Sequence, residues 1–481
     1  MNYIPHIKLL KTINAAYFYD VNRNEIVPVK WDSFLYLNDV LQKKINFGDH
    51  LPREVRELKE AGYLSDFHPT FIRHPYTESL PSVLKRKLRK ITLQITQDCN
   101  FRCKYCIYSN TDGQKQRQHS KAKMTFETAK KAVDFLADHS IDSEQVDIGF
   151  YGGEPLLMFD LVKRVVEYAV QRFEGKTLTF SMTSNASLLT KEIVSFLAKY
   201  EIPLMISLDG PKEIQDKNRV LADGHTGTFE VVKEKLKMVQ NDFPEFFSKM
   251  SVNMVIDPSN SFELVRSLEN DEVFGKLRFQ ISMLDEEYTP GLEEDEEGKS
   301  TLHYSDAFRE EYQYMDFLVQ LALMGRLEES SLPKVMTSVF SSDKTIDRSL
   351  LPRKQMNETA APSGPCIPGQ KRLFIDVNGN FFPCERVSET AQVMCIGNLE
   401  DGFWLQKADD LLNIGALTAN ACKNCWAFSF CTLCAKSVER NGELDPAYKT
   451  LHCASVRDSA EAKLYDFLLQ QEATVYYGHI V

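Results

Sequence analysis

The chain has 481 residues and a formal net charge of −11, with 57 Lys and Arg against 68 Asp and Glu, a balance that argues against a protein built mainly to coat nucleic acid. Hydrophobic residues make up 43% and charged residues 26%, which excludes wholesale disorder, and the length predicts about three domains. Neither a secretory signal nor a run of about 20 apolar residues is present, so we expect a cytoplasmic protein that spans no membrane.

The first segment, residues 1–85, is expected to form a small separate module. Strand-like runs at 7–11, 15–21 and 25–31 are followed by helical patterns at 31–42 and 52–64. Three strands and two helices predict a winged-helix-like unit. The first helix is expected to bury Phe34, Leu35, Leu37 and Leu41 in its core.

Residues 86–300 alternate between strand and helix. Strand patterns end near residues 96, 153, 185, 210, 257 and 284, amphipathic segments lie between them, and Thr125 and Thr190 are expected helix N-caps. Repeated β-then-α units predict a parallel sheet wound right-handed, and six of them suit a partial (β/α)6 TIM barrel of the α/β class. A helical bridging segment at 301–360 and a cysteine-rich region at 361–481 complete the expected organisation.

The eleven cysteines indicate metal ligation rather than disulfides. A disulfide framework belongs to small secreted domains, whereas tight clusters in a reducing compartment favour zinc or iron–sulfur. Cys99, Cys103 and Cys106 form a CxxxCxxC pattern after a strand. Three thiolates can hold three corners of an iron–sulfur cube and leave one iron open. A zinc site needs a fourth ligand, and the nearest candidates, Tyr108 and His119, do not continue a zinc-ligand spacing.

This pattern, with the aromatic Tyr105 inside it, resembles the signature of the radical S-adenosylmethionine (SAM) superfamily. The segment Gly152-Gly153-Glu154-Pro155 after the second strand resembles the motif that binds the amino group of SAM in that family, although a tight turn explains it equally well when taken alone. The resemblance also places five polar residues near the SAM ribose and carboxylate, each with a capping or salt-bridge role as the alternative: Ser184, Asn185, Ser207, Asp209 and Arg219.

The later cysteines resemble the SPASM domain, which extends a subset of these enzymes. The resemblance implies one auxiliary [4Fe–4S] cluster on Cys422, Cys425, Cys431 and Cys453, and a second on Cys366, Cys384 and Cys434. Two residues separate Cys431 from Cys434 where the family pattern has three. Cys395 is either a further ligand of the second cluster or a buried thiol. A zinc ribbon is the alternative for the region as a whole.

A winged-helix-like unit ahead of these two regions resembles the leader-recognition element of ribosomal-peptide maturases. The whole is similar to the sactipeptide and ranthipeptide maturases, which form thioether links in Cys-rich peptides. The resemblance implies SAM and three [4Fe–4S] clusters as cofactors. It implies that a 5′-deoxyadenosyl radical takes hydrogen from an acceptor carbon, to which a cysteine sulfur of the precursor peptide then bonds. A flavodoxin- or ferredoxin-type protein would donate the electron.

Glu385 follows Cys384 directly, where related sulfatase maturases place a catalytic acid; a surface carboxylate beside a ligand is the ordinary alternative. Three other functions stay open. A sulfatase-type maturase would share both cluster regions without needing the N-terminal module. A maturase that makes carbon–carbon or ether crosslinks would share all three parts. A zinc-ribbon DNA-binding protein is the alternative from a different class.

Overall fold

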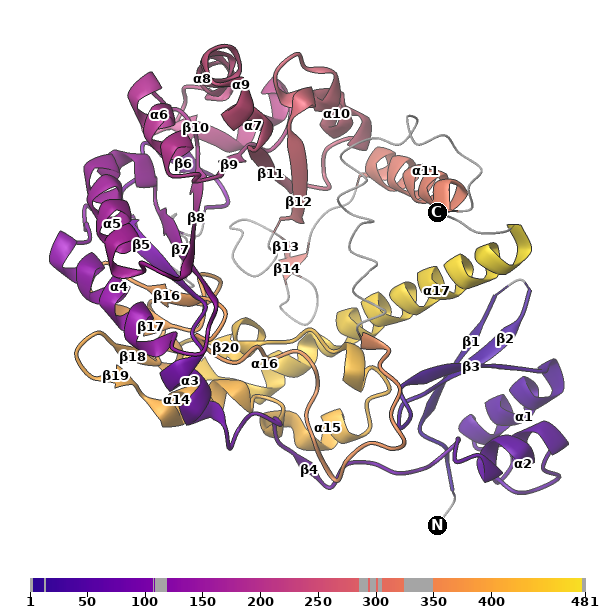
Figure 1. Ribbon diagram of the computed structural model, residues 1–481. Coiled ribbons are helices and arrows are strands. Elements are labelled where there is room, and N and C mark those ends of the chain that lie inside the picture. Colours follow the sequence, from indigo (N-terminus) through magenta and orange to yellow (C-terminus); the bar gives the residue numbers. More distant parts are fainter. Residues whose placement is uncertain are drawn as a thin grey trace.

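The computed structural model describes residues 3–12, 14–106, 108, 119–284, 293–294, 300–301, 305–323 and 349–477. Figure 1 shows an arc of strands and outer helices, a C-terminal region beneath it, and an N-terminal unit to one side. Of the segment 301–360, where a helical bridge is expected, residues 301, 305–323 and 349–360 are described, and they include helix α11 (Asp306–Leu323).

The N-terminal module, residues 3–64, is a three-stranded antiparallel sheet with two helices. Its elements are β1 (Ile7–Lys11), β2 (Ala16–Asp20), β3 (Glu25–Val29), α1 (Trp31–Leu41) and α2 (Arg53–Glu60). The strand order is β1-β2-β3. A hydrophobic core of its own includes Phe18, Leu37, Val40 and Val55, so the helices are held to the sheet by buried apolar surface.

Helix α1 presents a different face to this core than the sequence predicts. Leu35 was expected to be buried, but its side chain is 56% exposed. The buried positions are Ser33, Tyr36, Leu37 and Val40. Because successive helical residues are about 100° apart, Leu35 lies on the side opposite Leu37.

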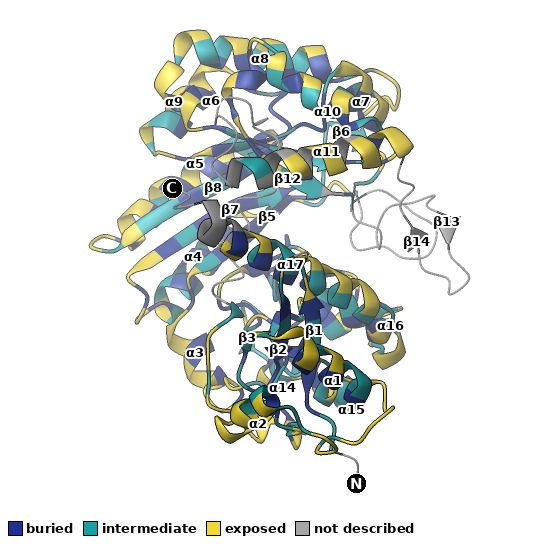
Figure 2. Cartoon of the chain, turned by 90° about the vertical axis from the view of Figure 1, so that its right-hand side faces the viewer, coloured by how far each residue is buried: buried dark blue, intermediate teal, exposed yellow. Residues whose placement is uncertain are grey.

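The central part of the chain is the expected partial barrel. Its six parallel strands are β5 (Lys90–Thr96), β7 (Gln145–Gly152), β8 (Thr177–Ser184), β9 (Leu204–Ser207), β11 (Ser251–Ile256) and β12 (Arg278–Met283). Neighbours in space are neighbours in this series, and every pairing between them is parallel. Figure 2 shows buried residues along these strands and exposed residues on the outer faces of helices such as α8. The fold prediction is therefore confirmed.

Helices connect the strands and cover the outside of the sheet. The connecting helices are α4 (Phe126–His139), α5 (Phe159–Arg172), α6 (Lys191–Lys199), α7 (Lys212–Asn218), α8 (Phe229–Asp242), α9 (Pro244–Ser248) and α10 (Phe262–Arg266). The side chain of Thr125 accepts from the Thr128 N–H, and that of Thr190 from the Ile193 N–H. Both expected N-caps are thus confirmed.

A short strand pair lies at the mouth of the barrel. Strands β6 (Phe101–Cys103) and β10 (Arg219–Leu221) are antiparallel, with Arg219 opposite Cys103. The sequence analysis did not predict this pair, because three-residue strands carry almost no periodic signal. Its effect is to tie the cysteine loop that follows β5 to the segment that follows β9.

The C-terminal region continues the same sheet. Strand β16 (Leu373–Ile375) pairs in parallel with β5, and β17 (Asn380–Phe382), β18 (Gly397–Asn398) and β19 (Gly402–Phe403) follow as antiparallel neighbours. Further elements of this region are α14 (Leu405–Leu412), α15 (Ala419–Lys423), β20 (Glu439–Arg440), β21 (Glu443–Leu444), α16 (Pro446–Leu451) and α17 (Cys453–Tyr477). Helix α3 (Leu80–Arg86) precedes the barrel. Strand β4 (Phe71–Ile72) pairs with β15 (Thr359–Ala360).

A second shared core joins the N-terminal module to the C-terminal region. Leu10, Tyr19 and Val21 from the module pack with Phe428 and Phe430. Figure 1 accordingly shows α17 running beside β1 and β2. Among the described residues, no helix is long and apolar enough to cross a membrane.

Candidate functional site

The polar motifs predicted from the sequence lie where successive barrel strands end. Cys99 follows β5, Gly152 ends β7, Ser184 ends β8 and Ser207 ends β9. Because these strands are parallel neighbours, their carboxyl ends meet at one edge of the sheet. The structure therefore brings these predicted site segments together.

The cluster loop, residues 97–106, carries the first three cysteines. Burial raises the pKa of Cys99 and of Cys103 to about 12, and the electrostatic effect of Cys106 raises both of these pKa values further. N–H groups point at the sulfurs: Phe101 N lies 3.4 Å from Cys99 Sγ, and Arg219 Nη1 lies 3.8 Å from Cys103 Sγ. Such donors suit thiolates that are deprotonated by a bound metal.

The two glycines after β7 allow that strand end to touch the cluster loop. Gly152 has φ +144°, and a Cβ there would lie 2.2 Å from the Thr96 carbonyl oxygen. A Cβ on Gly153 would lie 2.0 Å from the Asp98 carbonyl oxygen and 3.1 Å from the Cys99 Cβ. Only glycine fits, so this pair holds the loop and the strand end at backbone contact distance.

Glu154 is almost fully buried, and its hydrogen bonds connect the ends of β7 and β8. Its carboxylate accepts from Ser184 Oγ at 2.8 Å, from the Asn185 N–H at 2.8 Å and from the Leu156 N–H at 3.0 Å. Burial is the largest influence on its pKa and raises it. The predicted SAM residues Glu154, Ser184 and Asn185 thus form one hydrogen-bonded unit, with Pro155 opening the short helix η1 (Pro155–Met158) beside it.

Asp209, Arg219 and Tyr105 form a second buried unit. Arg219 Nε donates to Asp209 Oδ1 at 2.9 Å, and the Tyr105 hydroxyl donates to the same carboxylate at 2.6 Å. Exposure is 0% for Asp209 and 8% for Arg219. Because Arg219 also approaches Cys103, this unit links the end of β9 to the cluster loop. Ser207 ends β9 next to it, half-buried.

A glutamate that sequence reasoning missed lies beside the cluster loop. Glu389 accepts from Gln94 Nε2 at 2.6 Å and from Gln97 Nε2 at 3.2 Å. Gln94 is fully buried and also donates to the Tyr108 hydroxyl at 3.0 Å. The sequence signal for this contact is a glutamine inside a run predicted to be a buried strand, which implies a polar partner for Gln94 but does not identify it.

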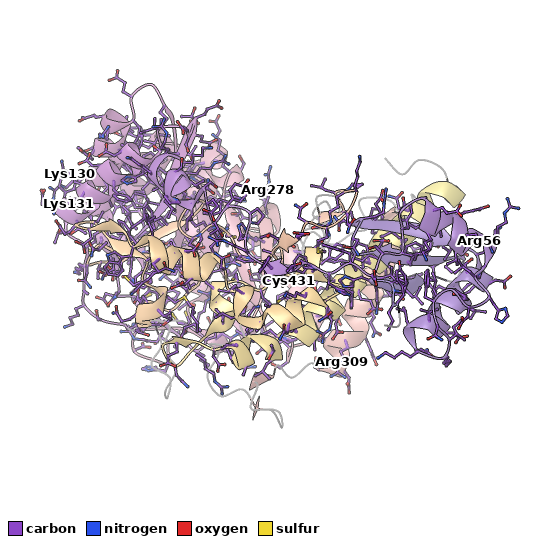
Figure 3. All side chains as sticks on the ribbon, turned by 90° about the horizontal axis from the view of Figure 1, so that it is seen from below. Arg56, Lys130, Lys131, Arg278, Arg309 and Cys431 are labelled. Carbon is purple, nitrogen blue, oxygen red and sulfur yellow. The ribbon has the colours of Figure 1, made fainter. Side chains whose placement is uncertain are left out.

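The four-cysteine set predicted from the sequence consists of Cys422, Cys425, Cys431 and Cys453, and these residues lie close enough to interact electrostatically. Burial raises the pKa of the Cys425, Cys431 and Cys453 thiols, and the nearby Cys422 thiol raises the pKa of each of these three further. The positive charge of Lys449 is the largest influence that lowers the pKa of Cys453. In Figure 3, Cys431 lies between the barrel and the N-terminal module.

The remaining cysteines separate into three environments. Cys384 and Cys434 act on each other electrostatically, and burial raises the pKa of Cys384 to about 11. Cys366 is exposed. Cys395 is 4% exposed and its thiol points to the Gly397 carbonyl oxygen at 3.4 Å, which suits the buried-thiol interpretation.

Glu385 makes an ion pair with Arg372. The distance from Arg372 Nη1 to Glu385 Oε1 is 2.7 Å, and the Glu385 side chain is 21% exposed. Its charge is the second influence on the pKa of Cys384, after burial. Glu385 therefore lies beside a predicted ligand, as both of its interpretations require.

The donor chemistry of these thiols fits iron–sulfur clusters. All eleven cysteines are free of disulfides. In the part of the chain that the structure describes, no three His, Cys, Asp or Glu side chains converge as ligands of a single metal ion do. In a [4Fe–4S] cluster each cysteine binds a different iron, so its ligands do not need to converge so tightly.

Comparison with protein families decides the identity of the central part. Residues 93–269 match the family described as the radical SAM superfamily. This part of the chain is a radical SAM domain. The match covers the cluster loop and all the barrel motifs described above. A radical SAM domain implies SAM and one [4Fe–4S] cluster as its cofactors.

Curated relatives resemble parts of the chain. An uncharacterized protein of Methanocaldococcus jannaschii is 33% identical over 146 residues, 30% of this chain and 47% of that protein. The radical SAM cyclopropyl synthase TigE of Paramaledivibacter caminithermalis is 28% identical over 173 residues, 34% of this chain and 36% of that protein. The chain thus spans less than half the length of these two relatives. A cysteine-type anaerobic sulfatase-maturating enzyme of Clostridium perfringens is 22% identical over 343 residues, 69% of this chain and 84% of that enzyme.

A solved structure of native anSMEcpe with bound AdoMet has the same fold. The TM-score is 0.56 at 17% identity, and the match covers 80% of this chain and 99% of that one. The likeness therefore extends beyond the radical SAM domain into the regions that flank it, as a likeness of fold.

Proposed function

We propose that the protein is a radical SAM maturase that installs thioether crosslinks, from cysteine sulfur to carbon, in a ribosomally made Cys-rich precursor peptide. The observation that carries the proposal is a combination within one chain: a three-thiol loop at the barrel mouth, a separate four-cysteine set, and a small sheet whose strand β3 pairs only with β2 among the described residues. When bound, SAM and its cluster supply a 5′-deoxyadenosyl radical.

In this proposal the N-terminal module binds the leader of the precursor by adding a strand at β3. Helix α17 lies beside the opposite edge strand (Figure 1), and Lys8 of β1 forms an ion pair with Glu461 of α17 at 2.8 Å. Next to β3, helix α1 exposes Trp31 (47%) and Leu35 (56%), one turn apart. Pro28 in β3 lacks an N–H, which is tolerated at a sheet edge. A bound leader would keep the core peptide at high local concentration.

The cofactor residues of this proposal are those that the sequence motifs predict. The SAM cluster is assigned to Cys99, Cys103 and Cys106, and one auxiliary [4Fe–4S] cluster to the four-cysteine set. The second auxiliary cluster is assigned to Cys366, Cys384 and Cys434. SAM itself is assigned to Tyr105, Gly152, Gly153, Glu154, Pro155, Ser184, Asn185, Ser207, Asp209 and Arg219. Since the Glu154 carboxylate already accepts three protein hydrogen bonds, we assign it a role in shaping the SAM site.

Two neighbouring reactions remain as alternatives. A sulfatase-type maturase would use the same thiol groups, and one such enzyme is among the relatives. A maturase that forms carbon–carbon or ether crosslinks would use the same three parts, and a relative that is named a cyclopropyl synthase belongs to the same superfamily. The N-terminal sheet favours a leader-bearing peptide over a sulfatase as substrate.

Mass spectrometry of a Cys-rich peptide encoded beside the gene, incubated with the enzyme, SAM and reductant, tests the proposal. We expect the peptide to lose two hydrogens per crosslink, and its cysteines to resist alkylation. The matched control is the full-length Cys103→Ala variant, which is expected to leave the peptide mass unchanged. A wild-type reaction that cleaves SAM but never changes the peptide would refute the peptide substrate. Crosslinks that leave every cysteine open to alkylation would instead favour the carbon–carbon or ether alternative.

The cofactor content is tested separately after anaerobic purification. Three [4Fe–4S] clusters predict about twelve irons per chain, with matching sulfide. Zinc without sulfide would support the zinc-ribbon alternative for the C-terminal region.

A further inference from the structure

Lys449 is a buried lysine inside the four-cysteine set. It lies on α16 and is 2% exposed. Its Nζ donates to Thr418 Oγ1 at 2.5 Å and to Cys422 Sγ at 3.7 Å, and Thr418 Oγ1 itself lies 3.3 Å from Cys422 Sγ. The ammonium is therefore directed at a cysteine sulfur, and among the described residues its other hydrogen-bond partner is the Thr418 hydroxyl group.

The start of α16 fixes this lysine in place. Asp445 is the N-cap, and its carboxylate accepts from the Ala447 and Tyr448 N–H groups. The helix passes close to a second cysteine, because Cys453 Sγ lies 4.0 Å from the Lys449 carbonyl oxygen. Lys449 also acts electrostatically on Cys431 and Cys453. Lys449 thus interacts with three of the four cysteines, with Cys422 by a hydrogen bond and with Cys431 and Cys453 electrostatically.

The described residues provide no carboxylate as an ion-pair partner for Lys449. The nearest acidic residue in sequence, Asp445, uses its side chain to cap the helix. A charged ammonium group that is removed from water costs several kcal/mol unless an opposite charge compensates it. The negative charge that compensates the Lys449 ammonium group is therefore carried by the cysteine sulfurs.

We propose that Lys449 is the counter-ion of the [4Fe–4S] cluster assigned to the four-cysteine set, and that it raises the reduction potential of that cluster. This inference rests on the proposed function, which assigns the cluster. Reduction adds one electron, and so one negative charge, beside a fixed positive charge. Net charge and hydrogen bonds to sulfur are among the factors that set the potential of such clusters.

Arg457 is a second cation that acts on this set, and it is placed differently. Arg457 influences Cys425 and Cys453 electrostatically. It is half-buried on α17, so water screens its charge more than that of Lys449. The larger effect on the cluster is therefore expected from Lys449.

A redox titration of the full-length chain, followed by electron paramagnetic resonance, tests the proposal. The SAM cluster is removed by Cys99→Ala and Cys103→Ala, so that the auxiliary clusters are observed, and dithionite supplies the electrons. In Lys449→Met we expect the reduction potential of one of the two auxiliary clusters to fall. The equilibrium constant for its reduction should decrease at least tenfold, which corresponds to about 59 mV for one electron. The other auxiliary potential is expected to stay unchanged.

Two matched variants separate charge from packing. Lys449→Arg keeps the positive charge and is expected to keep the wild-type potential. Lys131→Met removes the same charge from an exposed position on α4, 57% exposed and labelled in Figure 3, and is expected to shift neither potential. An intact cluster with an unchanged potential in Lys449→Met would overturn the proposal.

Loss of the cluster is also informative. If Lys449→Met and Lys449→Gln both lose the auxiliary iron while Lys449→Arg retains it, the requirement for a positive counter-charge is supported. If Lys449→Arg loses it equally, the residue acts by packing and the proposal fails. If the parent chain itself holds no reducible auxiliary cluster, the cluster assignment in the proposed function fails as well.

Discussion

At the scale of single residues, the buried ion pair between Asp209 and Arg219 is expected to matter most for stability. Replacing Arg219 by Met leaves the Asp209 carboxylate buried without its cation, which typically costs about 3–5 kcal/mol. Urea denaturation should show this loss in Arg219→Met. Arg309, labelled in Figure 3, has a 59% exposed side chain. Arg309→Met is therefore the control and is expected to match the wild type, and equal stabilities for the two variants would contradict the prediction.

The hydrogen bonds of Glu154 lead to a second prediction. In Glu154→Gln, one carboxylate oxygen becomes an NH2 group that faces another donor, either the Asn185 N–H at Oε2 or the Leu156 N–H and the Ser184 hydroxyl at Oε1. A buried donor left without an acceptor costs about 1–3 kcal/mol. Thermal or urea unfolding of Glu154→Gln should show that loss. The exposed Glu127→Gln on α4 provides the control, and a Glu154→Gln protein as stable as this control would rule out these hydrogen bonds.

Which residue types occupy the site could be predicted from the sequence, but their partners could not. The spacing of Cys99, Cys103 and Cys106 and the position of Glu154 after a strand were visible in one dimension. That Glu154 binds Ser184 rather than standing open, and that Glu389 reaches Gln94 some 295 residues away in sequence, depends on strand order. Hydrogen bonds across such separations leave no local pattern.

At the scale of elements, the contact between Gly153 and the cluster loop carries the third prediction. The Cβ of Gly153→Ala would collide with the Asp98 carbonyl oxygen, so the loop must move away. We expect the variant to lose iron from the SAM cluster while it retains the auxiliary iron. Gly175→Ala is the control, because nothing lies within 4 Å of its Cβ, although its φ of +82° brings a modest stability cost. Unchanged iron content in Gly153→Ala would show that the contact does not position the loop.

The long elements follow from local pattern, and the short ones do not. The segment 90–96 is predicted as a strand, and β5 has those bounds. The signal is the repeat of Ile91, Leu93 and Ile95 at the two-residue period of a strand. Strands β6 and β10 pair through only three residues each. In helix α1, Leu35 faces solvent, although its apolar side chain predicts a buried position. Tertiary pairing decides such cases.

At the scale of the whole molecule, separate domains in the sequence become continuous structure. The sequence analysis places a boundary near residue 361, yet β16 extends the barrel sheet directly from β5. The N-terminal module likewise shares a core with the C-terminal region through Tyr19 and Phe430, whose ring centroids are 5.2 Å apart. Such joins depend on which surfaces remain apolar after each unit folds, and composition along the chain does not show that.

The junction between the N-terminal module and the C-terminal region carries the last prediction. His6 is buried there against His68, with ring centroids 4.2 Å apart, and His68 Nδ1 lies 2.9 Å from the Lys423 carbonyl oxygen. Burial first, then His68, lowers the pKa of His6 to about 4. In the unfolded chain the pKa of His6 is near its ordinary value of 6.5. Between about pH 6.5 and pH 4, His6 therefore binds a proton in the unfolded chain but not in the folded one. The resulting stability is fully present above about pH 6.5 and is lost as the pH falls toward 4.

This loss can be measured between pH 7.5 and pH 5.5. Each pH unit inside the window costs at most about 1.4 kcal/mol per proton, so the wild type should lose about 1 kcal/mol more than His6→Phe, which cannot bind the proton. His225, whose side chain is 81% exposed, is the matched control. His225→Phe should lose as much stability as the wild type, because this substitution leaves His6 and the junction unchanged. If His6→Phe declined as steeply as His225→Phe, the junction would not be the origin of the acid sensitivity, and docking of the module would have to be independent of His6.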